Sequence, residues 1–158
     1  MPRVTPFLWF DSEALEAAEH YVAIFPNSEI GDISRYTDAG PGEAGKPMVV
    51  AFSLDGKAMM ALNGGPLFKF SEAVSFTVTC ADQDEIDYYW ERLGEGGQYS
   101  QCGWLKDKFG LSWQVVPDGM GELMAGPDPD AAKRGMAAVL KMTKLEIDVI
   151  RAAARGES

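Results

Sequence analysis

The stretch QCGWLKDKFGLSWQ, residues 101–114, decides the fold of this chain. Two apolar runs, 103–106 and 111–116, flank the polar link Asp107-Lys108-Phe109-Gly110, a pattern typical of two paired strands. Alternation along the second run places Ser112, Gln114 and Val116 on one face and Leu111, Trp113 and Val115 on the other. We therefore expect the last hairpin of a sheet, with Trp113 packed under a helix if Gln114 points toward a pocket.

This hairpin ends a unit whose order occurs twice along the chain. In the second unit we expect a strand over 74–80, a helix from the capping residue Asp82 to Leu93, and strands at 98–101, 103–106 and 111–116. In the first unit we expect a strand over 5–10, a helix over 13–25 capped by Asp11 and Ser12, and strands at 30–36, 48–54 and 57–62. The residues Asp55-Gly56 join the last two of these strands as a tight turn.

A shift of 71 residues brings the two units into register. It superposes the capping residues and the apolar helix positions, in the pairs Asp11 with Asp82, Leu15 with Ile86, Ala18 with Tyr89 and Val22 with Leu93. The chain is thus predicted to be α+β, with two βαβββ repeats at about 4–63 and 73–117. Neither small sheet covers its own apolar face, so we expect the repeats to pair into one cupped mixed sheet with the helices outside.

Added helices are expected after the second repeat, at about 127–154. The residues Gly126-Pro127-Asp128-Pro129 open a helix that runs to Met142, and Thr143 and Glu146 have capping-box spacing for a restart toward Ala154. The apolar positions of these helices form a packing face, with a lid or a contact to a partner subunit as the alternative: Met136, Val139, Leu140, Leu145, Val149 and Ile150.

Length and charge limit the functions that the chain can have. Its 158 residues, of which 46% are hydrophobic, fit a single globular domain over 1–158. The net charge of −10 repels phosphate backbones and anionic lipids, so we expect neither nucleic acid nor a membrane as a partner. Without an apolar stretch of signal-peptide or membrane-spanning length, the chain is expected to be cytoplasmic.

Three segments together resemble one family: TPFLWF at 5–10, ALNGGP at 61–66, and the stretch 101–114. They are similar to the PhnB-like branch, labelled 3-demethylubiquinone-9 3-methyltransferase-like, of the vicinal oxygen chelate superfamily, which includes glyoxalase I and bleomycin-resistance proteins. The resemblance runs from Thr5 to about Ile150. It implies a glyoxalase/bleomycin resistance/dioxygenase-like fold, a homodimer, and a ligand bound in the cupped sheet.

Enzymes of this superfamily hold a divalent ion in the cup, commonly through His and Glu side chains. The resemblance places the four ligand positions near Thr5, near Ala61, at Ala73 or Ser75, and at Gln114, where an amide replaces the usual Glu. The sole histidine, His20, is predicted to face solvent from the first helix. We therefore expect no metal and no cofactor, and no glyoxalase-type enediolate chemistry.

The remaining pocket candidates are neutral and aromatic. We expect Trp9, Asn63, Ser75, Trp104 and Gln114 to contact a ligand, although core packing is an alternative for both tryptophans. Three residues near the pocket are candidates for catalysis, namely Cys102, Lys106 and Asp107, the last two as a pair at the rim. Cys80 and Cys102 are otherwise expected to be reduced, partly buried thiols.

Amides and indoles suit recognition of a planar or apolar molecule better than acid–base chemistry. The sequence therefore favours a metal-independent small-molecule-binding protein that forms a homodimer. The first alternative is an enzyme on a small substrate that uses Cys102 or the Lys106–Asp107 pair, or that has the methyltransferase activity of the family label. Against that label, Gly64-Gly65-Pro66 is predicted to be a plain turn rather than a nucleotide-binding loop. A third possibility is a dimer whose pocket is filled by its own side chains.

Overall fold

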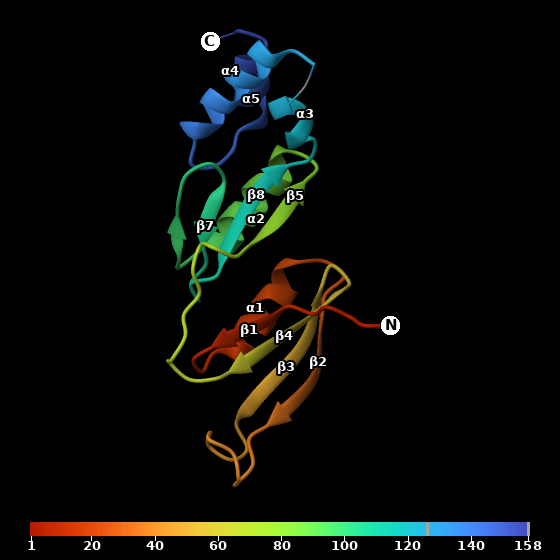
Figure 1. The fold of residues 1–158 in the computed structure, drawn as a ribbon, viewed down its shortest axis with the longest axis vertical. Coiled ribbons are helices and arrows are strands. Elements are labelled where there is room, and N and C mark those ends of the chain that lie inside the picture. The colour runs from red at the N-terminus through yellow and green to blue at the C-terminus, as the bar shows by residue number, and fades with distance from the viewer. Residues whose placement is uncertain (126, 158) are drawn as a thin grey trace. The chain divides into compact units, whose positions relative to one another are not determined.

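The computed structural model describes residues 1–125 and 127–157, which form two compact units, 1–70 and 71 onward. The junction falls between the two predicted repeats, of which the first ends at about 63 and the second begins at about 73. Each unit contains its own four-stranded mixed sheet with a helix along one face (Figure 1).

The first unit contains β1 (Phe7–Phe10), α1 (Ala14–Ile24), β2 (Glu29–Arg35), β3 (Pro47–Leu54) and β4 (Lys57–Asn63). The strand order is β1-β4-β3-β2, with β1 parallel to β4 and the other pairs antiparallel. Asp55 and Gly56 both have positive φ, 50° and 73°, which confirms the predicted tight turn between β3 and β4.

The second unit repeats this topology with β5 (Ser75–Cys80), α2 (Gln83–Gly94), β6 (Gln98–Tyr99), β7 (Trp104–Lys106) and β8 (Ser112–Pro117), in the order β5-β8-β7-β6. The predicted α+β class and the βαβββ repeat are confirmed. Three helices follow, namely α3 (Met120–Ala125), α4 (Pro129–Leu140) and α5 (Ile147–Ala154). The sequence pattern predicted α4 and α5 but missed the short α3. Of the residues proposed to open α4, Gly126 lies outside the described residues.

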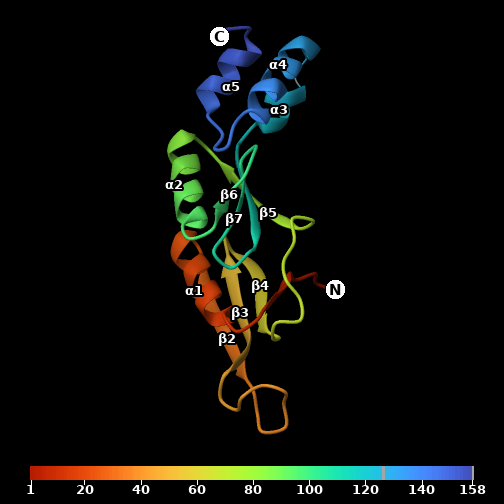
Figure 2. The same ribbon diagram turned by 90° about the vertical axis from the view of Figure 1, so that its left-hand side faces the viewer.

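In each unit the helix lies along one face of the sheet, α1 in the first and α2 in the second (Figure 2), and each of these helices buries one side. The buried positions Ala14, Ala18 and Tyr21 of α1 correspond to Ile86, Trp90 and Leu93 of α2. These pairs are 72 residues apart, so the predicted shift of 71 was wrong by one. Consequently Leu15 and Val22, predicted to lie on the buried face, are only half-buried, and His20 is half-buried rather than solvent-facing.

The structure corrects two of the predicted helix caps. Neither Asp11 nor Ser12 caps α1. Instead Asn63, at the end of β4, accepts a hydrogen bond from the Ala14 N–H at 2.8 Å. Thr143 and Glu146 likewise do not cap α5, because Gln83 of α2 accepts from the Ile147 N–H at 2.8 Å. Both acceptors lie far from these helix ends in the chain, 49 residues away for Asn63 and 64 for Gln83, so local sequence does not reveal them.

The caps predicted at Asp82 and Asp128 are confirmed. The Asp82 side chain accepts a hydrogen bond from the Glu85 N–H, and the Asp128 side chain accepts one from the Asp130 N–H, with Pro129 in the first turn of α4.

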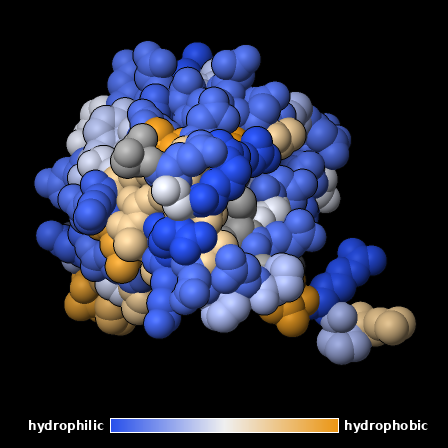
Figure 3. Space-filling view, turned by 90° about the horizontal axis from the view of Figure 1, so that it is seen from above, coloured by the Kyte–Doolittle hydropathy of each residue, from blue (hydrophilic) through white to orange (hydrophobic). Residues whose placement is uncertain are grey.

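The C-terminal helices are joined to the second sheet through backbone hydrogen bonds. The N–H groups of Cys102 and Gly103 donate to the carbonyls of Met142 and Thr143, each at 2.8 Å. Cys102 and Met142 also pack against a buried cluster of the C-terminal segment, formed by Val139, Leu145 and Ile150. The other half of the predicted packing face is exposed, at Met136, Leu140 and Val149. Figure 3 shows apolar patches among the polar residues on the face seen from above.

Among the described helices, none combines the length and the apolar character that crossing a membrane requires.

Candidate functional site

The second sheet has one face that α2 does not cover, which we call the open face. Its residues are Ser75, Thr77 and Thr79 of β5, Ser112, Gln114 and Val116 of β8, and Trp104 and Lys106 of β7. The opposite face, toward α2, carries the buried side chains Leu105, Trp113 and Val115. This confirms the alternation predicted for 111–116 and the burial of Trp113.

Strand register brings three predicted ligand contacts together on the open face. Gln114 lies opposite Trp104 in the antiparallel pair β7–β8 and beside Thr77 in the parallel pair β5–β8. The Gln114 side-chain amide donates a hydrogen bond to the Ser75 hydroxyl at 2.9 Å. The open face thus combines the hydrogen-bonded amide of Gln114, the hydroxyls of Ser75 and Thr77, and the half-buried indole of Trp104.

Lys106 lies on the same face. It is in register with Ser112 on β8, which is in turn in register with Ser75 on β5. The Lys106 ammonium forms an ion pair with Glu72, which precedes β5. A hydrogen bond from Lys106 and its positive charge lower the pKa of the Glu72 carboxyl, so Glu72 is ionised at neutral pH. Ser112 is fully buried beside this pair.

Asp107 does not form a pair with Lys106. Only 3% of Asp107 is exposed, and its Oδ1 accepts hydrogen bonds from the Phe109 and Leu111 N–H groups at 2.9 and 3.0 Å. Its Oδ2 accepts one from the Trp113 indole at 2.9 Å. The residue predicted at the pocket rim is therefore a buried anchor for the turn 107–110.

Cys102 precedes β7 and is not one of the strand residues of the open face. It has a positive φ of 60° and packs against the Val139, Leu145 and Ile150 cluster of the C-terminal helices. Cys80, the other thiol, is fully buried, and burial together with the charges of Glu85 and Asp82 raises its pKa to about 12. The raised pKa keeps Cys80 in its thiol form at neutral pH, so it is not a nucleophile.

Trp9 and Asn63 belong to the first unit. The Trp9 indole donates a hydrogen bond to the Gly65 carbonyl at 2.9 Å and contacts the Phe68 ring edge to face, with the ring centroids 5.0 Å apart. A Cβ at Gly64 would overlap the Trp9 ring. The Gly64 and Gly65 N–H groups donate to the carbonyls of Phe10 and Asp11. The predicted turn at Gly64-Gly65 therefore encloses an indole.

Both polar ends of the Asn63 side chain are used within the first unit. Oδ1 caps α1, and Nδ2 donates to the Pro47 carbonyl at 3.0 Å. Asn63 also lines a hollow of about 430 Å³ beside the loop 37–47, together with Tyr36, Lys46 and Gly64. The Tyr36 hydroxyl donates to the Asn63 carbonyl. Asn63 thus has a structural role whether or not a ligand reaches this hollow.

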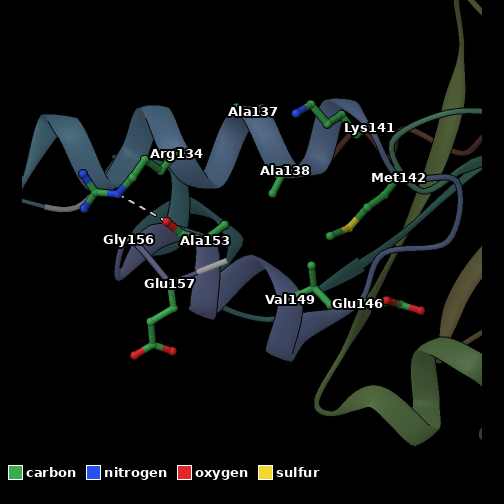
Figure 4. Close-up of a pocket in the computed structure, with 10 residues that line it drawn as sticks. All are labelled: Arg134, Ala137, Ala138, Lys141, Met142, Glu146, Val149, Ala153, Gly156 and Glu157. Atoms are coloured by element: carbon green, nitrogen blue, oxygen red, sulfur yellow. Dashed lines mark hydrogen bonds between the residues drawn. The ribbon is translucent and has the colours of Figure 1, made fainter.

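A second hollow, of about 500 Å³, lies between α4 and α5 (Figure 4). Its lining is mostly apolar, with Ala137, Ala138 and Met142 from the α4 side. Arg134 spans it and donates hydrogen bonds to the Ala153 and Ala154 carbonyls at the end of α5. This contact joins the two helices and completes the last turn of α5.

The residues at the implied metal positions do not fit a divalent ion. Gln114 and Ser75 offer a neutral amide and a neutral hydroxyl that already bond to each other. Ala61 is fully buried in the first unit, and its neighbours on the uncovered side of β4 are Met60 and Leu62. In residues 1–125 and 127–157, no group of three or more His, Cys, Asp or Glu side chains is placed to hold a metal. We therefore derive no chemistry through a metal.

The repeated βαβββ units have the glyoxalase/bleomycin-resistance type of fold, and comparisons with solved structures agree on this fold. A protein from Pseudomonas aeruginosa superposes with a TM-score of 0.60 at 20% identity, covering 75% of this chain and 100% of that one. The fosfomycin resistance protein FosX from Listeria monocytogenes, complexed with Mn(II) and sulfate, superposes with a TM-score of 0.52 at 14% identity, covering 77% and 93%.

Residues 2–116 match the family model of 3-demethylubiquinone-9 3-methyltransferase, so the chain belongs to this PhnB-type family. A PhnB protein from Bacillus cereus is 35% identical, with a TM-score of 0.68, covering 73% of this chain and 99% of that one. A search of curated proteins finds no match. The family match ends at β8, so α3, α4 and α5 lie beyond it.

The sequence analysis did not single out Thr77 and Thr79 of the open face, or Glu72, which precedes β5. Thr77 follows Ser75 by two residues, so strand alternation was a sufficient signal for it. Glu72 carried no such signal, because its pairing with Lys106 depends on β5 and β7 flanking β8 in the sheet.

Proposed function

We propose that this protein binds a planar small molecule on the open face of its second sheet, without a metal ion. The observation that carries the proposal is the juxtaposition of Trp104, Gln114 and Ser75, which supplies an indole surface beside a fixed amide and hydroxyl. Aromatic surfaces with a few placed polar groups are typical of sites for small organic ligands.

The placement of the catalytic candidates supports binding over catalysis. The Asp107 carboxylate accepts three hydrogen bonds in the core, and Lys106 is paired with Glu72. Cys102 packs among apolar side chains of the C-terminal helices. A general base or a nucleophile needs access to substrate, which the placements of Asp107 and Cys102 do not provide.

Methyl transfer, the activity in the family description, receives no support from the glycine-rich turn. A nucleotide-type methyl donor is normally bound by free backbone N–H groups at the start of a helix. Here the Gly64 and Gly65 N–H groups donate to Phe10 and Asp11, and a turn follows rather than a helix. We therefore do not assign this activity to the chain.

We also propose that the protein is a cytoplasmic homodimer. Two free cysteines, Cys80 and Cys102, suit a reducing compartment, and the superfamily resemblance implies the dimer. Light scattering after size-exclusion chromatography tests the dimer, for which we expect twice the chain mass of 17.2 kDa. A mass of one chain across the concentration range would contradict it.

The binding proposal is tested by thermal shift on chelator-treated protein, with planar aromatic amides such as 2-naphthamide and with Zn²⁺, Ni²⁺ and Mn²⁺. We expect the aromatic probe alone to raise Tm. Gln114→Ala and Trp104→Leu should abolish the shift, whereas Gln101→Ala, an exposed glutamine outside the sheet, should preserve it. If a metal ion raises Tm and Gln114→Ala abolishes this rise, the hypothesis of metal-independent binding is contradicted.

A further inference from the structure

The Lys106–Glu72 ion pair crosses the open face above one strand. Lys106 is on β7 and Glu72 precedes β5, while β8 lies between β5 and β7 in the sheet. Ser112 is the β8 residue in register with both Lys106 and Ser75. The two charged side chains therefore meet over Ser112.

Ser112 has an unusual environment for a hydroxyl. It is fully buried, and its Oγ has no hydrogen-bond partner in the part of the chain that the structure describes. An isolated buried hydroxyl is unfavourable, so such groups call for a specific explanation. Here the hydroxyl lies in one row with the Ser75 hydroxyl and the Lys106 ammonium, which are both potential donors to an anion.

We propose that Lys106, Ser112 and Ser75 form a carboxylate subsite and that Glu72 is an internal stand-in for the carboxylate of the ligand. This inference rests on the proposed function and deepens it by naming the ligand class, a planar molecule with one carboxylate. The ligand's ring lies on Trp104 and Gln114, and its carboxylate replaces that of Glu72 on Lys106.

Exposure and charge make this exchange feasible. The Lys106 and Glu72 side chains are 38% and 60% exposed, and an exposed ion pair contributes little net stability. Glu72 can therefore move into water while a ligand carboxylate takes its place. The net charge of −10 repels anions from the surface as a whole, so a carboxylate binds only where a cation such as Lys106 is placed locally.

The test compares 2-naphthoate with 2-naphthamide, which match in shape and differ in charge, by calorimetric titration of the full chain. We expect Glu72→Gln to tighten 2-naphthoate about fivefold by removing the competitor, and Lys106→Gln to weaken it similarly. Ser112→Ala should weaken 2-naphthoate without lowering Tm, because its hydroxyl has no partner to lose within the described chain. None of these variants should change the affinity for 2-naphthamide.

Asp87→Asn is the matched control. Asp87 lies on α2 and forms an ion pair with Lys144, which lies between α4 and α5, so its loss should leave both affinities unchanged. Equal affinity for the two probes in every variant would overturn the carboxylate subsite and leave the proposed function standing. Absence of binding by both probes in all variants would overturn both proposals.

Discussion

The indole Nε1 of Trp113 donates a hydrogen bond to Oδ2 of Asp107 at 2.9 Å, and both side chains are buried. Oδ1 of the same carboxylate accepts from the backbone of the turn between β7 and β8. A single carboxylate therefore fixes the turn and the buried face of β8. Since neighbouring residues of a strand alternate, it also fixes the direction of Gln114 on the open face.

Asp107→Asn should destabilise the protein by about 2–3 kcal/mol, because the N–H₂ group of an amide cannot accept the hydrogen bonds that the carboxylate accepts in the core. Urea unfolding measures the loss. Asp118→Asn, which changes an exposed carboxylate beside Gly119, is the control and should stay within about 0.5 kcal/mol of the parent protein. Equal stability of the two variants would show that Asp107 is not an anchor.

Asn63→Ala should cost about 1–2 kcal/mol, because it removes the acceptor that caps α1. Asp11→Ala and Ser12→Ala remove the caps that the local sequence suggests, and both should change stability by less than about 0.5 kcal/mol. Thermal unfolding followed by circular dichroism compares the three variants. A larger loss of stability in Asp11→Ala or Ser12→Ala than in Asn63→Ala would show that a local residue caps α1.

Gly64→Ala should destabilise the first unit by about 1–3 kcal/mol, because the new methyl group overlaps the Trp9 indole. Combining it with Trp9→Leu should recover part of this loss, which a double-mutant cycle measures. Gly121→Ala, where a Cβ meets only open space, should be neutral or stabilising. Additive effects of the Gly64 and Trp9 changes would contradict the contact.

Cys80 should make stability depend on pH in alkaline solution. Burial raises its pKa in the folded state from the usual value near 9 to about 12. The thiol is therefore protonated in both the folded and the unfolded chain below pH 9, and there it does not reduce the unfolding free energy. Between pH 9 and 12 the unfolded chain ionises more readily, and the unfolding free energy should fall by up to about 1.4 kcal/mol per pH unit. Urea unfolding at pH 8 and pH 10 should show this loss in the parent and in Cys102→Ala. The loss should be smaller in Cys80→Ala, and an equal loss there would assign it to another group.

Local pattern was sufficient for the elements and for the faces of the strands. Alternation in 111–116 separated Gln114 from Trp113 because neighbouring side chains of a strand point to opposite faces. The Asp55-Gly56 turn was equally local, since positive φ values favour these residue types. The helix faces were predicted with an error of one position because low similarity between the repeats left the shift poorly fixed.

The sequence by itself determined two βαβββ units, their order, and the placement of Gln114 and Trp113 on opposite faces of β8, since these follow from periodicity within short segments. Only the tertiary structure decided that Asn63 caps α1, that Gln83 caps α5, and that Lys106 pairs with Glu72 rather than with Asp107. Each of these contacts joins residues far apart in the chain. Strand register and helix packing bring these residues together, and neither register nor packing is encoded in a short segment of sequence.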